Sequence, residues 1–359
     1  MPLRILIINF EMDRLSRAIP YAQQVVNLLA QRCEQVVVMT SRVGSYDKPD
    51  NVHLELIPAR PWGLPQRLGG TYLVNLQAYR LIKQHRIDAC FIHMAAHWSY
   101  ELQPAFRLTG TPLLVWFAHG VITPQTRRSV MVANRVITPS PESCRVEAKH
   151  IHVIGHGIDT DIFNLPPMQP QRNSVISVSR ITPRKRIDLL VDVIQALRAI
   201  PGAPSIDLQM IGTIGNEGDQ PYDHVIRERI WNQGLENIIH MKGYVPQKYI
   251  PHFYRSAFLH INFCEQCAMD KTLLEALACG CPVLTSSEPF FDLLKDYPEF
   301  IVKDLNPDAI ARQVLEIYHK RDSYDRAALR NLIVGRHDIH SYVGKIMSHL
   351  EELVAQRRL

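Results

Sequence analysis

Short apolar runs rich in β-branched residues alternate with amphipathic segments along most of the chain. This alternation predicts parallel strands joined by crossover helices, which is an α/β fold. In the first half, the predicted strands are residues 4–10, 34–40, 53–58, 88–93, 112–118, 134–140 and 151–155. Segments with helical periodicity lie between most of these runs, for example residues 21–32 and 71–85.

A proline-rich stretch without periodicity, residues 161–173, then predicts a linker. After it the alternation restarts, with predicted strands at 174–180, 206–212, 237–243, 257–263 and 282–286, and predicted helices at 186–199, 222–233, 246–255 and 271–278. We therefore divide the chain into two doubly wound domains, residues 1–160 and 174–338. A last helix follows at 339–359, and packing against the first domain is one option for it.

The composition is that of an ordinary globular protein, with 46% hydrophobic and 21% charged residues among 359. No run approaches eighteen apolar residues, and the N-terminal segment reads as a buried strand rather than a signal peptide. We therefore expect a cytoplasmic protein whose seven cysteines are reduced.

The positive charge is confined to the first half of the chain. Residues 1–161 hold 17 Lys and Arg against 12 Asp and Glu, whereas the remainder holds 23 of each. A modest basic surface suits an anionic partner or the inner face of a membrane, and a solvated surface with scattered arginines explains it equally well. Without a dense basic run or a recognition motif, nucleic acid is not an expected partner.

Ligands of doubly wound domains bind beyond the carboxyl ends of the strands. The chain has no GxGxxG motif, and the nearest match, residues 212–218, has the wrong spacing. A dinucleotide-dependent dehydrogenase is therefore disfavoured.

The stretch CEQCAMDKTLLEALACGCPV, residues 264–283, allows two interpretations. Its four cysteines, Cys264, Cys267, Cys279 and Cys281, could form a zinc site. However, the last two flank a glycine that ends a helix and precedes a buried strand, where cysteine packs as a small apolar residue.

The alternative is an anion site at the start of the helix 271–278. Asp270 is a natural N-cap, and Lys271, Thr272 and Leu273 form a first turn whose amides and dipole attract an anion. Glu275 lies one turn further along, where its carboxylate can accept hydrogen bonds from ribose hydroxyls. Arg180 and Lys185 follow the first strand of the second half and are expected at the same surface crevice, as for a diphosphate site.

The run LEALACGCPV, residues 274–283, resembles the signature of glycosyltransferase family 4, whose GT-B fold consists of two Rossmann-like domains facing across a cleft. Other segments resemble the family in the same order: FAHG at 117–120, GHGIDTDIF at 155–163, ISVSRITPRKRIDLL at 176–190 and MKGYVPQKYIPHFYRSA at 241–257. The resemblance covers most of the chain and is strongest in the second half.

This resemblance implies a retaining, metal-independent transferase that moves a sugar from a nucleotide-diphosphate sugar to an acceptor hydroxyl and needs no cofactor. Arg180 and Lys185 would stabilise the leaving diphosphate, and Glu275 would bind the ribose. Backbone groups at Gly243 and Tyr244 would bind the base, and His119 would lie near the transferred sugar. The acceptor would be a glycan, a glycolipid or a small molecule, as in polysaccharide or glycolipid biosynthesis.

The sequence departs from the family pattern at three places. Cys267 stands where the family has a glutamate that contacts the sugar, and Glu265 lies two residues earlier. Asp270 stands where glycine is frequent, so its carboxylate would compete with a phosphate for the same amides. The first loop lacks the Gly-Gly pair of the family, and Arg17 is a candidate substitute as an anion contact.

His93 and His97 follow a predicted strand and are candidates for the acceptor side of the cleft. Their spacing also resembles a metal pair, but no nearby carboxylate or cysteine completes such a site. Core or surface histidines are the remaining interpretation. For the whole protein, two alternatives stay open: a sugar-nucleotide epimerase or hydrolase on the same fold, and an inactive nucleotide-sugar-binding homologue.

Overall fold

The computed structural model describes residues 2–16, 21–58, 69–165, 174–264 and 268–358. The chain forms two compact units. Unit 1 consists of residues 1–157 and 339–359, and unit 2 consists of residues 158–338. The boundary at Gly157 lies three residues before the one suggested by the sequence.

Unit 1 contains a parallel sheet that has seven strands within the described residues, in the order β3-β2-β1-β4-β5-β6-β7. Ile5 of β1 lies opposite Val36 of β2 and Ala89 of β4, so β1 is an interior strand. The strand bounds are β1 Arg4–Met12, β2 Gln35–Val43, β3 Val52–Leu56, β4 Ala89–Ile92, β5 Leu113–Trp116, β6 Arg135–Thr138 and β7 Ile151–Val153.

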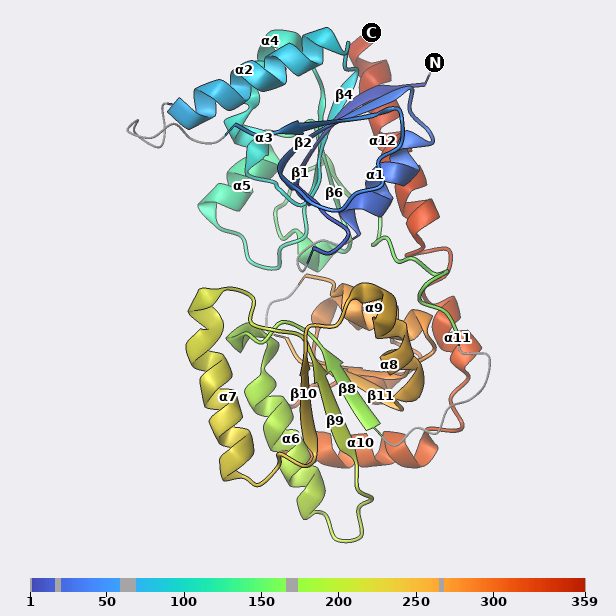
Figure 1. The fold of residues 1–359 in the computed structure, drawn as a ribbon. Helices are drawn as coiled ribbons and strands as arrows, with labels where there is room; N and C mark the ends of the chain where they lie inside the picture. Colours follow the sequence, from blue (N-terminus) through green and yellow to red (C-terminus); the bar gives the residue numbers. More distant parts are fainter. Residues whose placement is uncertain (1, 17–20, 59–68, 166–173, 265–267, 359) are drawn as a thin grey trace. The chain divides into compact units, whose positions relative to one another are not determined.

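Helices cover both faces of this sheet (Figure 1). Because side chains alternate along a strand, Ile5 and Ile7 of β1 enter one core with α1 and α12, and Leu6 and Ile8 enter the other with α2 and α4. The helices of unit 1 are α1 Ala22–Ala30, α2 Gly69–Gln84, α3 Trp98–Glu101, α4 Gln103–Thr109, α5 Pro124–Met131 and α12 Ile339–Arg358.

The C-terminal helix α12 is an integral part of unit 1. Its buried residues recur every three or four positions, from Ile339 and Val343 through Ile346 and Leu350 to Leu353, and they join the core around α1. Polar contacts add to this packing: the Lys345 ammonium donates to the Ile154 carbonyl at 2.9 Å.

Unit 2 repeats the doubly wound pattern with a parallel sheet of five described strands, in the order β10-β9-β8-β11-β12. The bounds are β8 Ser174–Val178, β9 Asp207–Ile211, β10 Ile239–Gly243, β11 Leu259–Asn262 and β12 Val283–Thr285. The α-helices are α6 Ile187–Ala199, α7 Gln220–Asn232, α8 Ile250–Ser256, α9 Lys271–Ala278, α10 Pro307–Lys320 and α11 Arg326–Asn331. The predicted α/β class with two doubly wound halves is therefore confirmed.

The segments that enter and leave unit 2 lie side by side. The amide of Ile158 donates to the His337 carbonyl at 2.7 Å, and the Thr160 hydroxyl donates to Asp338 at 2.7 Å. Phe163, within the expected linker, is 1% exposed in the core of unit 2, so residues 161–165 are not a free linker. The rest of that stretch, residues 166–173, lies outside the described residues.

No helix among the described residues has both the length and the apolar character needed to cross a bilayer.

Candidate functional site

The candidate site lies in unit 2, where the order of the strands reverses. β8 and β11 are neighbours in the sheet, but the chain continues from β8 to β9 on one side and from β11 to β12 on the other side. In doubly wound folds this switch point leaves a crevice at the carboxyl ends of the two strands. Arg180 and Lys185 follow β8, and Asn262 and Asp270 end or follow β11, so one sheet edge carries all four residues.

Lys185 is held by a tight turn before α6. It ends the 3₁₀ turn η2, Pro183–Lys185, and the next residue, Arg186, has a φ of 44°. A non-glycine residue in this left-handed region is strained, and such strain concentrates at functional sites. The start of α6 is fixed in turn by Tyr222, whose hydroxyl donates to Asp188 at 2.8 Å.

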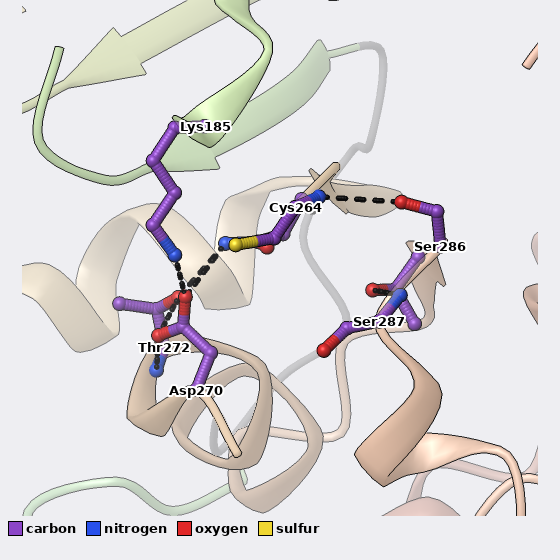
Figure 2. A network of polar contacts seen from close by, with 8 residues as sticks. Lys185, Cys264, Asp270, Thr272, Ser286 and Ser287 are labelled. Carbon is purple, nitrogen blue, oxygen red and sulfur yellow. Dashed lines mark hydrogen bonds and ion pairs between the residues drawn. The ribbon is translucent and has the colours of Figure 1, made fainter. Parts of the chain in front are cut away.

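Asp270 caps α9, as the sequence predicts. Its Oδ1 accepts from the amide of Thr272 at 3.1 Å and from the Thr272 hydroxyl at 3.0 Å. Its Oδ2 forms an ion pair with the Lys185 ammonium and accepts a hydrogen bond from the side-chain Nδ2 of Asn262 at 3.1 Å. Figure 2 shows Lys185, Asp270 and Thr272 converging on one point at the start of the helix.

The Lys185–Asp270 pair is largely buried, with each side chain 14% exposed. Burial by itself raises the pKa of Asp270, but the Lys185 ammonium and the Thr272 hydrogen bonds outweigh it and hold this pKa well below its usual value. Asp270 is therefore a carboxylate under all ordinary conditions. The sequence predicts Lys185 at a surface crevice, and in the structure its ammonium is already paired with Asp270.

Glu275 lies one turn further along α9 and is 7% exposed. Burial raises its pKa, and Lys271, four residues earlier, opposes that shift. Gln247, in the 3₁₀ turn η4 (Gln247–Tyr249), donates weakly to Glu275 at 3.4 Å. This contact links α9 to the turn that follows β10 and the expected base contacts Gly243 and Tyr244.

Glycines shape the backbone on the base side of the site. Gly243 ends β10 with a φ of 69°, and its carbonyl accepts from the amide of Gly212 at 2.9 Å. A Cβ at Gly212 would lie 1.9 Å from the Ser179 carbonyl oxygen, so only glycine allows this approach between β9 and β8. Tyr244, which follows Gly243, is 37% exposed and presents its ring at the surface.

Arg180 lies exposed at the carboxyl end of β8. A Cβ at Gly215 would lie 3.3 Å from the Arg180 Cδ, so the side chain runs along the loop after β9. The hydrogen bonds and ion pairs given above join Lys185, Asp270, Thr272 and Asn262, and Arg180 is outside this network. Of the two predicted cations, the structure therefore brings only Lys185 onto the start of α9.

The remaining described candidates lie in unit 1. His119 is exposed just after β5, and its amide donates to the Ser143 carbonyl at 2.8 Å. His93 is 1% exposed among the rings of Tyr21, Phe91 and Trp116, which matches the core interpretation. His97 is partly exposed, with its ring 4.9 Å from that of Trp98.

Arg17, Glu265 and Cys267 lie outside the described residues. Within the described part, no group of three or more His, Cys, Asp or Glu side chains has an arrangement that could hold a metal ion. Cys264 is disulfide-bonded in the structure, so the expectation of reduced cysteines is wrong at this position. Five other cysteines are buried free thiols: Cys33, Cys90, Cys144, Cys279 and Cys281.

Sequence reasoning missed two polar residues of the site, Asn262 and Gln247. Asn262 is a polar residue, 3% exposed, at the end of the apolar strand β11. A polar residue at that position of a predicted buried strand indicates a hydrogen-bonding role and could have been recognised from the sequence. Gln247 carries no comparable signal, because its role depends on how the turn after β10 folds against α9.

Comparison with known proteins matches two family descriptions, one to each half of the chain. Residues 20–162 match Glycosyltransferase Family 4, and residues 160–331 match Glycosyl transferases group 1. The second match contains all the site residues of unit 2 named above.

A curated relative and several solved structures are similar to the chain. Mannosylfructose-phosphate synthase from Agrobacterium fabrum is 26% identical over 156 residues, which are 40% of this chain and 34% of that protein, so the match spans about a third of the relative's length. The Anabaena HepE structure with UDP and glucose has a TM-score of 0.77 at 16% identity, covering 97% of this chain and 99% of that one. Sucrose-phosphate synthase from Thermosynechococcus elongatus has a TM-score of 0.73 at 16% identity, covering 99% and 100%.

These structural matches cover nearly the whole chain and confirm the predicted GT-B fold. The two family matches together span residues 20–331. The chain therefore belongs to the family 4 glycosyltransferases.

Proposed function

We propose that this protein transfers a sugar from a nucleotide-diphosphate sugar to an acceptor hydroxyl, with retention at the anomeric carbon and without a metal ion or cofactor. The observation that carries the donor assignment is the cluster at the switch point of unit 2. There a lysine, the first turn of α9 and a buried glutamate one turn later lie together.

The chemistry of this cluster suits a nucleoside diphosphate. Lys185 and the start of α9 offer positive charge to phosphate oxygens, and Glu275 offers a carboxylate to ribose hydroxyls. The HepE structures that share the fold contain UDP, UDP-glucose, or UDP with glucose. UDP and UDP-sugars are therefore the first ligands to test.

In the proposed reaction the bond between the anomeric carbon and the diphosphate oxygen breaks, and a bond from that carbon to the acceptor oxygen forms. The electron pair of the broken bond leaves on the diphosphate, and the acceptor hydroxyl passes its proton to the departing diphosphate oxygen. Lys185 and Arg180 would stabilise the negative charge that develops on the leaving oxygen. Retention is supported by the family resemblance, and His119 is proposed as a contact of the transferred sugar.

The donor assignment is tested by calorimetric titration of UDP, UDP-glucose and the corresponding guanosine compounds. Glu275→Gln should weaken bare UDP and UDP-sugar alike, because both carry the ribose. Loss of a hydrogen bond to a charged group is worth about 1.5–3 kcal/mol, so the effect should exceed tenfold. Glu236→Gln is the matched control, because Glu236 is exposed and lies before the start of β10, whereas the site lies beyond the carboxyl end of this strand. Equal affinity of wild type and Glu275→Gln would contradict the assignment.

The transfer itself is tested by product analysis with candidate acceptors. A glycosyltransferase releases UDP together with an acceptor-dependent glycoside, and α-linkage to an α-donor would establish retention. An altered sugar nucleotide would indicate an epimerase, and free sugar without acceptor would indicate a hydrolase. Binding of UDP without turnover on any acceptor would indicate an inactive homologue. Activity that survives EDTA would support metal independence.

A further inference from the structure

The carboxylate of Asp270 occupies the position that a donor phosphate would need. We propose that Asp270 is an internal competitor of the donor: the diphosphate must displace this carboxylate from Lys185 and from the first turn of α9, and Asp270 thereby limits donor affinity. This inference rests on the proposed function and adds a determinant of affinity to the same site.

The first argument is the identity of the partners. A bound phosphate oxygen uses a lysine ammonium, a first-turn amide and neighbouring hydroxyl or amide groups. Asp270 already has each of these: the Lys185 ammonium, the Thr272 amide and hydroxyl, and the Asn262 side-chain amide. The Asp270 carboxylate therefore uses the same contacts that a bound phosphate would use (Figure 2).

The second argument is charge. Asp270 is ionised, because Lys185 and Thr272 hold its pKa well below the usual value. A diphosphate entering beside it would place like charges a few ångströms apart in a site where both side chains are 14% exposed and solvent screens little. Protonation cannot relieve this repulsion at neutral pH, so relief requires the carboxylate to leave Lys185.

The third argument is that the site stays incomplete with Asp270 in place. Asn262 is 3% exposed, and its side-chain oxygen has no hydrogen-bond partner among the described residues. The hydroxyl of Ser287, 1% exposed and drawn in the same view, likewise lacks a partner within the described part. Buried polar groups in native proteins normally have partners, so these oxygens of Asn262, which contacts Asp270, and of Ser287, which follows β12, indicate that a polar ligand binds at this edge of the sheet.

The test is the affinity of Asp270→Asn and Asp270→Ser for UDP and for uridine, measured by calorimetry. Asparagine and serine are also good N-caps, so α9 keeps its cap while the charge is removed. Both variants should bind UDP at least tenfold more tightly than wild type, which corresponds to about 1.4 kcal/mol. Their affinity for uridine should not change, because uridine carries no phosphate. Asp270→Glu keeps the charge and should show no such gain.

Asp325→Asn is the matched control. Asp325 caps α11 in the same unit, accepting from Ala327 at 2.9 Å and Ala328 at 3.2 Å. Its neighbour Arg326 binds the carbonyl of Cys279 at 3.0 Å, at the end of α9 opposite Asp270. This variant removes one charge from the same unit without vacating the anion position, so its UDP affinity should equal that of wild type.

The outcomes separate this inference from the proposed function. If wild type binds UDP and both Asp270 variants bind it equally or more weakly, the inference is wrong and the donor assignment stands. If neither wild type nor any variant binds a nucleoside diphosphate, both are wrong. Circular dichroism and thermal unfolding of each variant confirm that it is folded. Should Asp270→Asn not fold, Asp270→Ser gives the same comparison, and failure of both to fold would show that Asp270 is structural rather than a displaceable competitor.

Discussion

Replacement of Lys185 by alanine should destabilise unit 2 as well as remove a donor contact. Lys185 is 14% exposed and is the cationic partner of Asp270. Removing one partner of a buried ion pair costs about 3–5 kcal/mol, because the other charge stays buried and unpaired. Asp270 would retain its hydrogen bonds from Thr272 and Asn262, so we expect the lower end, about 3 kcal/mol.

The reverse replacement should be milder. In Asp270→Asn the helix keeps its cap, and Lys185 can extend its flexible stem to bring the ammonium into water. We expect about 1 kcal/mol of destabilisation. In the double variant no unpaired charge remains, so the loss should be about 1–2 kcal/mol rather than the sum of the single losses, about 4 kcal/mol.

The assay is urea-dependent hydrogen exchange followed by mass spectrometry, read on peptides of β8, β11 and α9. It reports the opening free energy of unit 2 separately from that of unit 1. Lys185→Ala with wild-type stability would refute the reasoning, since the pair would then contribute nothing. Additive losses in the double variant would show that the two side chains are not energetically coupled.

Three further predictions concern buried groups of unit 2. Burial lowers the pKa of His260 to about 4, so the folded protein keeps this side chain neutral, whereas the unfolded chain takes up a proton below pH 6.5. The free energy of unfolding should therefore fall by up to about 3 kcal/mol as the pH is lowered from 6.5 to 4. In urea titrations, His260→Asn should flatten this pH dependence. Tyr254→Phe should leave stability unchanged or raise it in the same titrations, because the buried Tyr254 hydroxyl has no hydrogen-bond partner among the described residues. A loss of stability above about 1 kcal/mol would show that this hydroxyl does form a hydrogen bond in the folded protein. Elemental analysis should find no stoichiometric zinc, and EDTA should not shift the melting temperature. The reason is that zinc binds thiolates, whereas burial raises the pKa of the Cys279 thiol to about 12 and keeps it protonated. One zinc per chain would contradict this prediction.

Local signals in the sequence predicted α9 with both of its ends correct. Asp270 is a strong N-cap, and Gly280 has a φ of 66° just after the last turn, in the region that favours glycine. The strands were equally predictable, because buried parallel strands are continuous apolar runs. The doubly wound pattern then placed Arg180 and Lys185 at the same sheet edge as α9.

The pairing within the site could not be predicted in the same way. Lys185 and Asp270 are 85 residues apart, and a pattern that places both at one edge does not decide whether they bind each other or a ligand. Side-chain direction was also hidden: Arg180 runs along a neighbouring loop, and His93 points into a core of aromatic rings. These outcomes depend on tertiary packing rather than on local preference.

The position of α12 has a consequence for the order in which the chain acquires its structure during synthesis. The core around α1 takes eight of its buried side chains from this helix, which leaves the ribosome only after all of unit 2. Unit 2, residues 158–338, is continuous and can complete its core while the first 157 residues are still waiting for their final helix. N-terminal domains ordinarily fold first, so here the usual order is reversed. The part of the unit 1 sheet that α12 covers must meanwhile stay exposed beside α1, and this apolar surface is where we expect chaperones to bind the growing chain.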